Sequence, residues 1–193
     1  MAERHSSERA ESLSSGDGMK YDEKTVSENY IYRGKILSLR CDDAILPDGK
    51  ACKREIVEHS GGASVLAKTE QGIALVRQFR YAYHEEIYEI PAGKLNQGED
   101  PMEAAARELS EEAGLTAKNL KLLTVLYPTP GYTNEKIYIY EAVGLESGKN
   151  HLDEGEYLEV EYFSEEEVLS MIKDGRIKDA KTIAALFLSQ LKQ

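Results

Sequence analysis

Short stretches in which apolar and polar residues alternate, or which are mainly apolar and β-branched, recur along most of the chain, and both patterns are typical of β-strands. They cover residues 29–39, 40–46, 53–58, 64–67, 73–79, 87–90, 120–127, 136–143 and 156–163. Turn-forming sequences separate several of them, such as Pro47-Asp48-Gly49-Lys50 and Thr69-Glu70-Gln71-Gly72. The pattern therefore predicts a chain of short strands, many of them joined by tight turns.

Three other segments have the features of α-helices. Asp100-Pro101 is a helix-start signal, residues 102–113 contain neither Gly nor Pro, and Gly114 fits the residue that ends a helix. The sequence Ser-Glu-Glu-Glu at 164–167 is a capping-box pattern that begins a second helix, which extends to about residue 173. An apolar stripe predicts a C-terminal helix through Ala180, Ile183, Ala184, Phe187, Leu188 and Leu191. Strands on both sides of the central helix predict a mixed sheet between helices.

On this pattern the chain divides into three parts. Residues 1–19 are rich in Ser, Glu, Arg and Gly, so we expect a disordered tail. Residues 20–58 form an N-terminal β region of three expected strands, which bury too little surface to be stable alone. We expect this region to pack on the main domain, residues 59–193, or on a partner subunit.

Composition narrows the classes of function. The chain has 35 acidic and 24 basic residues, and its net charge of −11 argues against nonspecific binding to nucleic acid or anionic membrane. It contains no apolar run of membrane-spanning length and no recognisable signal peptide, so the expected location is the cytoplasm. Cys41 and Cys52 flank a predicted turn and could face each other across a hairpin. We favour reduced, packed thiols, which are usual in the cytoplasm.

The central helix carries the main candidate chemistry. Glu108 and Glu112 are four residues apart, so their carboxylates share one face, and Glu111 stands beside it. Arg107 can pair with Glu103 and with Glu111. Three carboxylates so close repel one another unless salt bridges, protons or a hard divalent cation such as Mg²⁺ neutralise them. From the helix alone, a solvated acidic face is the simpler interpretation.

The spacing around this helix changes that interpretation. Gly93 is followed after five residues by Glu99, and after seven more by the sequence Arg-Glu-Leu-Ser-Glu-Glu-Ala-Gly-Leu at 107–115. This arrangement resembles the signature of the Nudix hydrolase family, Gly-x5-Glu-x7-Arg-Glu-U-x-Glu-Glu-x-Gly-U with U aliphatic, at every fixed position. Seven fixed identities at about 5–10% each coincide by chance on the order of once in 10⁸ windows. The resemblance implies an α+β fold, the Nudix α/β/α sandwich with a mixed β-sheet, plus a small N-terminal antiparallel β region.

The resemblance also implies hydrolysis of a nucleoside diphosphate linked to another moiety. Glu108 and Glu112 would act in catalysis as ligands of a divalent metal, together with the backbone carbonyl of Ala92. The expected ion is Mg²⁺, with Mn²⁺ as an alternative. Arg107 and Glu111 would orient this cluster, although Glu111 could also bind the metal directly.

Two other signature positions have structural interpretations. Gly93 would allow a sharp turn that aims the Ala92 carbonyl at the metal. Glu99 is interpreted as an acid that stabilises the start of the helix.

Four segments outside the signature resemble the ADP-ribose pyrophosphatase branch of the family. They are Arg-Glu-Ile-Val-Glu-His at 54–59, Leu-Val-Arg-Gln-Phe-Arg at 75–80, Glu-Ile-Pro-Ala-Gly at 89–93 and Lys-Asp-Ala-Lys-Thr at 178–182. In that branch the N-terminal β region is exchanged across a homodimer, so the resemblance implies a homodimer.

The same branch takes its general base from an acidic loop after the signature, which here reads Asp153-Glu154-Gly155-Glu156. By position, Glu154 resembles the base and Glu156 resembles an additional metal ligand. Asp153 and Glu146 are alternative bases. Without the resemblance, these acids would be interpreted as solvated loop residues.

Three residues are candidates for binding substrate. Arg80, at the end of a predicted strand, can hold a diphosphate with two hydrogen bonds, or form a surface salt bridge. Arg54 could stack on adenine or bind phosphate from a partner subunit, or pack at a dimer contact. Glu135 could accept hydrogen bonds from the terminal ribose. Tyr30 and Tyr32 are possible adenine platforms, although strand tyrosines more often serve packing. The histidines lack the spacing of a metal site and receive no role.

The sequence thus predicts a Mg²⁺-dependent enzyme that hydrolyses ADP-ribose or a related ADP-sugar to AMP and a sugar phosphate, ribose 5-phosphate in the case of ADP-ribose. One alternative is a Nudix pyrophosphatase for another nucleoside diphosphate sugar, such as GDP-mannose or a UDP-sugar. Another is a non-catalytic Nudix nucleotide sensor, which normally has a broken signature or a fused DNA-binding domain.

Overall fold

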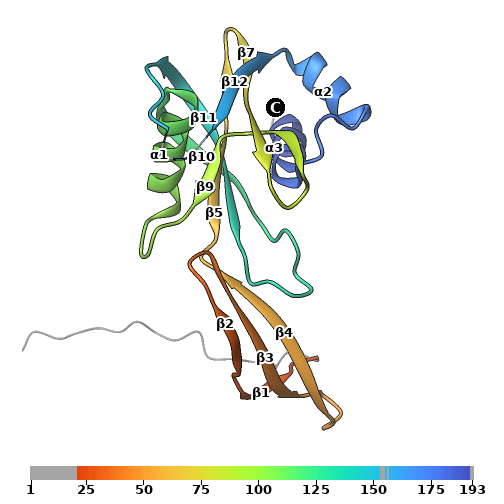
Figure 1. The fold of residues 1–193 in the computed structure, drawn as a ribbon. Helices are drawn as coiled ribbons and strands as arrows, with labels where there is room; N and C mark the ends of the chain where they lie inside the picture. The colour runs from red at the N-terminus through yellow and green to blue at the C-terminus, as the bar shows by residue number, and fades with distance from the viewer. Residues whose placement is uncertain (1–20, 153–154, 156, 192–193) are drawn as a thin grey trace, which may run out of the picture.

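The computed structural model describes residues 21–152, 155 and 157–191. Within these residues the strands form one sheet in the N-terminal region and two in the main domain. Figure 1 shows the N-terminal sheet projecting away from the main domain, where helices lie on both sides of the strands. The predicted α+β class is confirmed.

The N-terminal sheet is antiparallel. It contains β1 (Lys24–Ser27), β2 (Tyr30–Arg33), β3 (Leu37–Ile45) and β4 (Ala51–His59), and β3 pairs with each of the other three. The prediction of one continuous strand over residues 29–39 is wrong, because β2 ends at Arg33 and β3 begins at Leu37. The chain turns after β2, and a hydrogen bond of 2.9 Å from the Gly34 amide to the Leu37 carbonyl oxygen closes this turn.

The main domain is built on two four-stranded sheets. The first has the order β10 (Leu115–Leu126), β11 (Ile137–Ser147), β5 (Gly62–Leu66) and β9 (Ala92–Lys94). This sheet is mixed, because β11 and β5 are parallel and the other pairs are antiparallel. The second sheet is antiparallel and contains β6 (Lys68–Thr69), β7 (Gly72–Arg80), β8 (Glu85–Glu89) and β12 (Leu158–Phe163).

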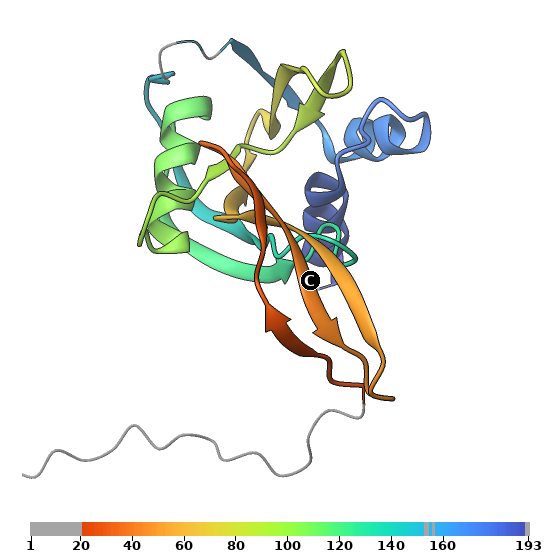
Figure 2. The same cartoon turned by 60° about the horizontal axis from the view of Figure 1, so that its bottom comes forward.

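Helices cover both faces of the mixed sheet, as predicted (Figures 1 and 2). On one face α1 (Pro101–Ala113) buries Ala104, Ala105 and Leu109 against the strands. On the other face lies α3 (Ala180–Leu191), and α2 (Glu165–Lys173), which packs against β7 and β12, contributes Val168 and Met171 to the same second core. Along β5, Val65 belongs to the first core and Leu66 to the second, because neighbouring strand side chains point to opposite faces.

The ends of the helices agree with the sequence signals. The Asp100 side chain accepts a hydrogen bond of 2.8 Å from the Met102 amide, and Gly114 has the left-handed conformation, with φ 63°. The capping box of Ser164 and Glu167 is present. These caps fix where α1 and α2 begin, and Gly114 fixes where the central helix ends.

Two other features of the chain bear on the predictions. Cys41 and Cys52 are free thiols that lie out of register, since Cys41 pairs with Glu55 and Cys52 with Ala44. The expectation that the two cysteines face each other across the hairpin is therefore wrong. The prediction of unlinked thiols is confirmed. In the described part of the chain, no helix is long and apolar enough to cross a membrane.

Candidate active site

The central helix α1 presents two carboxylates to the short strand β9. The side chains of Glu108 and Glu112 lie one turn apart and both residues are buried, with exposed fractions of 9% and 4%. The Ala92 amide donates a hydrogen bond of 2.8 Å to Oε2 of Glu112. Helix and strand therefore bring the two acids and the backbone of Ala92 together.

Gly93 is required because Glu108 lies directly against it. A Cβ atom at position 93 would stand only 1.9 Å from Oε1 of Glu108. Gly93 belongs to β9 and pairs with Ala63, and it is not among the glycines with a positive φ. The predicted reason for this glycine, a sharp turn, is thus replaced by a close approach between strand and helix.

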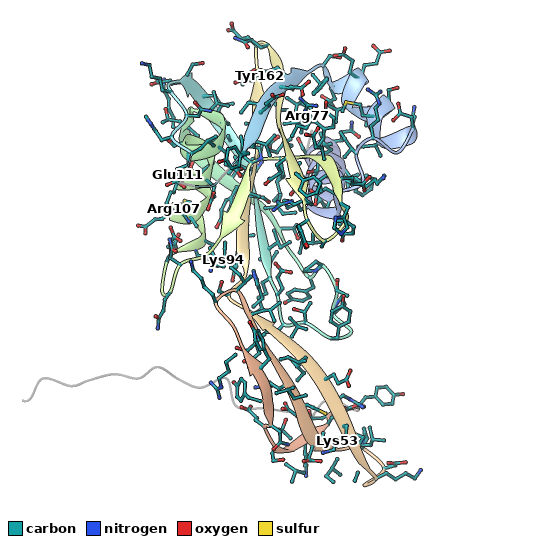
Figure 3. The ribbon with its side chains drawn as sticks, viewed as in Figure 1. Lys53, Arg77, Lys94, Arg107, Glu111 and Tyr162 are labelled. Carbon is teal, nitrogen blue, oxygen red and sulfur yellow. The ribbon has the colours of Figure 1, made fainter. Side chains whose placement is uncertain are left out.

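Arg107 holds the acidic cluster together (Figure 3). Its guanidinium makes two hydrogen bonds to Glu99, of 2.8 and 3.0 Å, and one each to Glu108 and Glu111, of 2.7 and 2.9 Å. The predicted contact with Glu111 is present. Among the described contacts of Arg107, Glu99 and Glu108 appear in place of the predicted partner Glu103.

The contacts of Glu99 have a clear electrostatic consequence. The hydrogen bonds from Arg107, followed by one from the Asn96 amide, lower the pKa of Glu99 from 4.5 to about 2. Hydrogen bonds to Glu99 in turn raise the pKa of Arg107. Glu99 thus stays ionised and anchors the loop before α1 to the helix.

A cavity of about 240 Å³ opens beside Ala92 and Gly93. Arg80 and Lys181 bring positive charge to its wall, and Glu135 lies in the same lining. Nδ1 of His59, another lining residue, is 3.3 Å from Oε1 of Glu135. The structure therefore brings Arg80, Glu135 and the Ala92 backbone to one place, and adds His59 and Lys181, to which sequence reasoning gave no role.

Arg80 is part of a charged network. Its guanidinium makes two hydrogen bonds, of 2.5 and 2.7 Å, to the carboxylate of Glu89, which is 1% exposed. Lys181 Nζ also contacts Glu89. Burial favours a higher pKa for Glu89, but the hydrogen bonds and charges of Arg80 and Lys181 outweigh burial, and the pKa is lowered. Glu89 and Lys181 both lie in segments that resemble the ADP-ribose pyrophosphatase branch. This resemblance was the one feature of the sequence that could have pointed to them.

The donors around Glu108 and Glu112 suit a hard divalent cation. Two carboxylates and the Ala92 carbonyl are oxygen ligands of the kind that Mg²⁺ prefers. Within residues 21–152, 155 and 157–191, no group of three or more His, Cys, Asp or Glu side chains could hold a metal ion. Glu108, Glu112 and the Ala92 carbonyl oxygen therefore suit part of a metal site.

The acidic loop is described only in part. Asp153, Glu154 and Glu156 lie outside the described residues. Glu146, the other alternative base, is on β11, where its carboxylate is 3.4 Å from Lys118 Nζ. It does not line the cavity beside Ala92.

The remaining predicted substrate residues lie in the N-terminal sheet. Arg54 makes two hydrogen bonds to Glu23, of 2.7 and 2.6 Å. Its neighbour Lys53 lies at the far end of this sheet from Lys94 and Arg107 (Figure 3). The Arg33 guanidinium lies 3.5 Å from the ring centroid of Tyr30, and Tyr32 is 57% exposed. The chain therefore does not bring Arg54 to its own cavity.

Comparisons with known proteins agree with the fold and show the family. Residues 58–186 match the model of the NUDIX domain, and residues 23–57 match the nucleoside diphosphate sugar hydrolase N-terminal domain. An ADP-ribose pyrophosphatase of Bacillus subtilis is 43% identical over 89% of this chain and 95% of its own length. A methanol dehydrogenase activator of Bacillus methanolicus is 40% identical, over 91% of this chain and 97% of its own. The crystal structure of an ADP compounds hydrolase has the same fold, with a TM-score of 0.78 at 22% identity over 92% of this chain and 96% of that one.

Proposed function

The chain belongs to the Nudix hydrolase family, and from this premise we propose that it hydrolyses the pyrophosphate of ADP-ribose, or of related ADP-sugars. The products are AMP and, from ADP-ribose, ribose 5-phosphate. The observation that carries the proposal is the placement of Glu108, Glu112 and Ala92 next to a cavity whose wall contains Arg80. Oxygen ligands for a divalent cation and a guanidinium for phosphate thus meet at one site.

In this proposal Glu108, Glu112 and the Ala92 carbonyl oxygen hold Mg²⁺, with Mn²⁺ as a second option. A bound divalent ion neutralises phosphate oxygens and makes bound water a stronger nucleophile. Arg107 keeps the carboxylates in place through its bonds to Glu108 and Glu111. The burial of Glu108 and Glu112 supports this assignment, because two adjacent buried acids gain most from a nearby cation.

The substrate is held by groups around the cavity. Arg80 binds the diphosphate, since a guanidinium matches two phosphate oxygens. Glu135 accepts hydrogen bonds from the hydroxyls of the terminal ribose, beside His59. We further propose Glu154 as the general base and Glu156 as an additional metal ligand, as the acidic loop of the related branch implies. Asp153 and Glu146 remain the alternative bases.

We propose a homodimer formed through the N-terminal sheet, residues 20–58, with residues 59–193 as the catalytic domain. The support is the exposure of apolar side chains on this sheet and its flank, with exposed fractions of 64% for Val26, 65% for Ile31 and 56% for Ile36. A second subunit would cover them and bring its own Arg54 to this cavity. The free thiols and the net charge of −11 support a cytoplasmic enzyme whose partner is a small nucleotide rather than nucleic acid or membrane.

A substrate panel tests the proposed activity. Purified enzyme with Mg²⁺ is assayed on ADP-ribose, ADP-glucose, GDP-mannose and UDP-glucose, and the four are ranked by kcat/KM. Product analysis in ¹⁸O-water shows which phosphorus receives the water oxygen. We expect ADP-ribose to rank first and to give AMP and ribose 5-phosphate.

Each other outcome selects a different function. A higher kcat/KM for GDP-mannose or a UDP-sugar would replace ADP-ribose by another nucleoside diphosphate sugar. Tight binding of ADP-ribose without any turnover in the presence of Mg²⁺ would indicate a nucleotide sensor.

A further inference from the structure

Three charged side chains meet behind the wall of the active cavity, and the roles assigned so far use only Arg80. Glu89, at the end of β8, is buried and receives two hydrogen bonds from Arg80. Nζ of Lys181, in the first turn of α3, contacts the same carboxylate. The lysine and the glutamate are 92 residues apart in the chain, so this contact joins the second sheet to the last helix.

The position of Lys181 is fixed by its surroundings. Asp179 Oδ1 is 3.1 Å from Lys181 Nζ, and Asp179 Oδ2 accepts hydrogen bonds of 2.9 and 2.6 Å from the amide and hydroxyl of Thr182. The Thr182 hydroxyl oxygen accepts a hydrogen bond of 2.9 Å from the Ile90 amide. The start of α3 is therefore tied directly to the residue that follows Glu89.

Charge balance shows what Lys181 adds. Asp179 lies at the N-terminus of α3, where the helix dipole and the Thr182 donors offset its negative charge. Arg80 and Glu89 alone would neutralise each other, and among the described lining residues Lys94 would then be the remaining lysine. With Asp179 counted, two cations and two anions balance, but Arg80 and Lys181 line the cavity whereas Glu89 and Asp179 do not, so the cations are the groups that face a ligand.

We propose that Lys181 is a positioning residue of the active site: it shares the buried Glu89 carboxylate with Arg80 and so keeps the Arg80 guanidinium oriented and available for the substrate diphosphate. This inference rests on the proposed pyrophosphatase function, because it assigns Arg80 to the diphosphate. Without Lys181, Glu89 is neutralised by Arg80 alone and draws the guanidinium away from the phosphate.

Replacement of Lys181 tests this role against a matched control. We expect Lys181→Met to raise KM for ADP-ribose about tenfold or more, the effect typical of residues that orient a binding group, with a smaller change in kcat. Lys181→Arg keeps a cation at this position and should restore KM to within about threefold of the parent value. The control is Lys178→Met, because Lys178 is exposed and its Nζ lies 3.1 Å from Glu85. This variant should keep the parent KM.

A double variant keeps the test decisive if Lys181→Met folds poorly, since it removes the buried Glu89 charge together with its lysine partner. If Lys181 acts through Glu89, the variant Glu89→Gln/Lys181→Met should have the same KM as Glu89→Gln. An additional tenfold loss in the double variant would instead indicate that Lys181 binds phosphate directly, and would overturn the positioning role.

The readouts also separate this inference from the proposed function. Mn²⁺ binding, followed by electron paramagnetic resonance, should be equal in the parent and in Lys181→Met, because the metal ligands lie on α1 and β9. A parent enzyme that hydrolyses ADP-ribose, combined with an unchanged KM in Lys181→Met, would refute the role of Lys181 alone. A parent enzyme that does not hydrolyse ADP-ribose would refute the function itself.

Discussion

The main domain and the N-terminal sheet differ in how they are stabilised. The main domain has two apolar cores, one on each face of its mixed sheet, and its candidate site lies on elements that these cores hold in place. Among the described residues, neither core includes a side chain from β1 to β4, and several apolar side chains there face solvent. One region can therefore maintain a precise geometry by itself, whereas the other gains stability by covering its apolar surface.

Two arginines that bear on the site, Arg107 in the main domain and Arg54 in the sheet, also differ in their contacts. In the main domain, Arg107 has three acidic partners and all of these side chains are at least partly buried. In the sheet, Arg54 pairs with Glu23 at the surface. Exposed ion pairs contribute little and exchange readily, because water screens them. Arg54 can thus leave Glu23 for a phosphate at small cost, whereas the Arg107 cluster is built to stay as it is.

The largest effect is expected where the main domain is most tightly packed. Gly93→Ala would place a methyl group 1.9 Å from the Glu108 carboxylate, so this carboxylate must leave its present position beside β9. We expect kcat/KM to fall by about 10²-fold or more, since a shift of about 1 Å in a positioned group is enough for such a loss. Steady-state assays and Mn²⁺ titration measure the effect. Gly148→Ala is the control, because a methyl group there meets only the Gly114 carbonyl oxygen, at 3.4 Å. Equal activity of the two variants would show that Glu108 does not need its present position.

A substitution on the sheet should act through assembly. Ile31→Glu places a charge on an apolar surface at a residue that is 65% exposed in the single chain, and we expect the proposed dimer to dissociate. Activity should fall by about tenfold, because Arg54 of the partner subunit is lost, while the thermal unfolding of the main domain stays nearly unchanged. Light scattering and activity are measured together. The control Val143→Glu changes a 50% exposed residue of β11. If the parent protein is a monomer in light scattering, the proposal that this sheet forms a dimer is wrong.

The smallest effect concerns stability. Because the pKa of Glu99 is lowered to about 2, its bonds to Arg107 stabilise the fold above pH 4.5, and this contribution is lost as the pH falls toward 2. Glu99→Gln should lower Tm by about 2–4 °C at pH 7, the shift for about 1 kcal/mol in a chain of this size. The difference between parent and variant should shrink from pH 4.5 to pH 2 in a series of melting curves. A difference that does not depend on pH would rule out the ionised Glu99–Arg107 contact as its source.

Local signals predicted α1 almost to the residue. Its start depends on Asp100 and Pro101 and its end on Gly114, and all three act within a few residues of themselves. The partners of Arg107 were predicted only in part, because Glu99 reaches it through a loop that folds back, which helix periodicity does not encode. The break near Gly34 was missed for a related reason. The run Arg33-Gly34-Lys35 interrupts the alternation there, but the turn itself depends on the hydrogen bond from Gly34 to Leu37 and on the pairing of β2 with β3, which a period does not encode.

The candidate site was predictable where it lies inside the signature. Glu108, Glu112 and Ala92 followed from the spacing and the family resemblance, and the structure brings them together. The contact between Glu89 and Lys181 was not predictable from a single sequence, because only the packing of α3 against the strands brings two residues so distant into contact. Sequence spacing describes one helix well and describes a contact between two elements poorly.

The most direct test of the central claim, that the main domain hydrolyses a pyrophosphate with the carboxylates of α1, is the activity of Glu112→Gln. The amide oxygen of glutamine can still accept the hydrogen bond from the Ala92 amide, so the fold should remain intact. Loss of a charged metal ligand costs several kcal/mol of transition-state stabilisation, and we therefore expect turnover of ADP-ribose with Mg²⁺ to fall by about 10³-fold. Hydrolysis at the parent rate by a correctly folded Glu112→Gln enzyme would contradict the account.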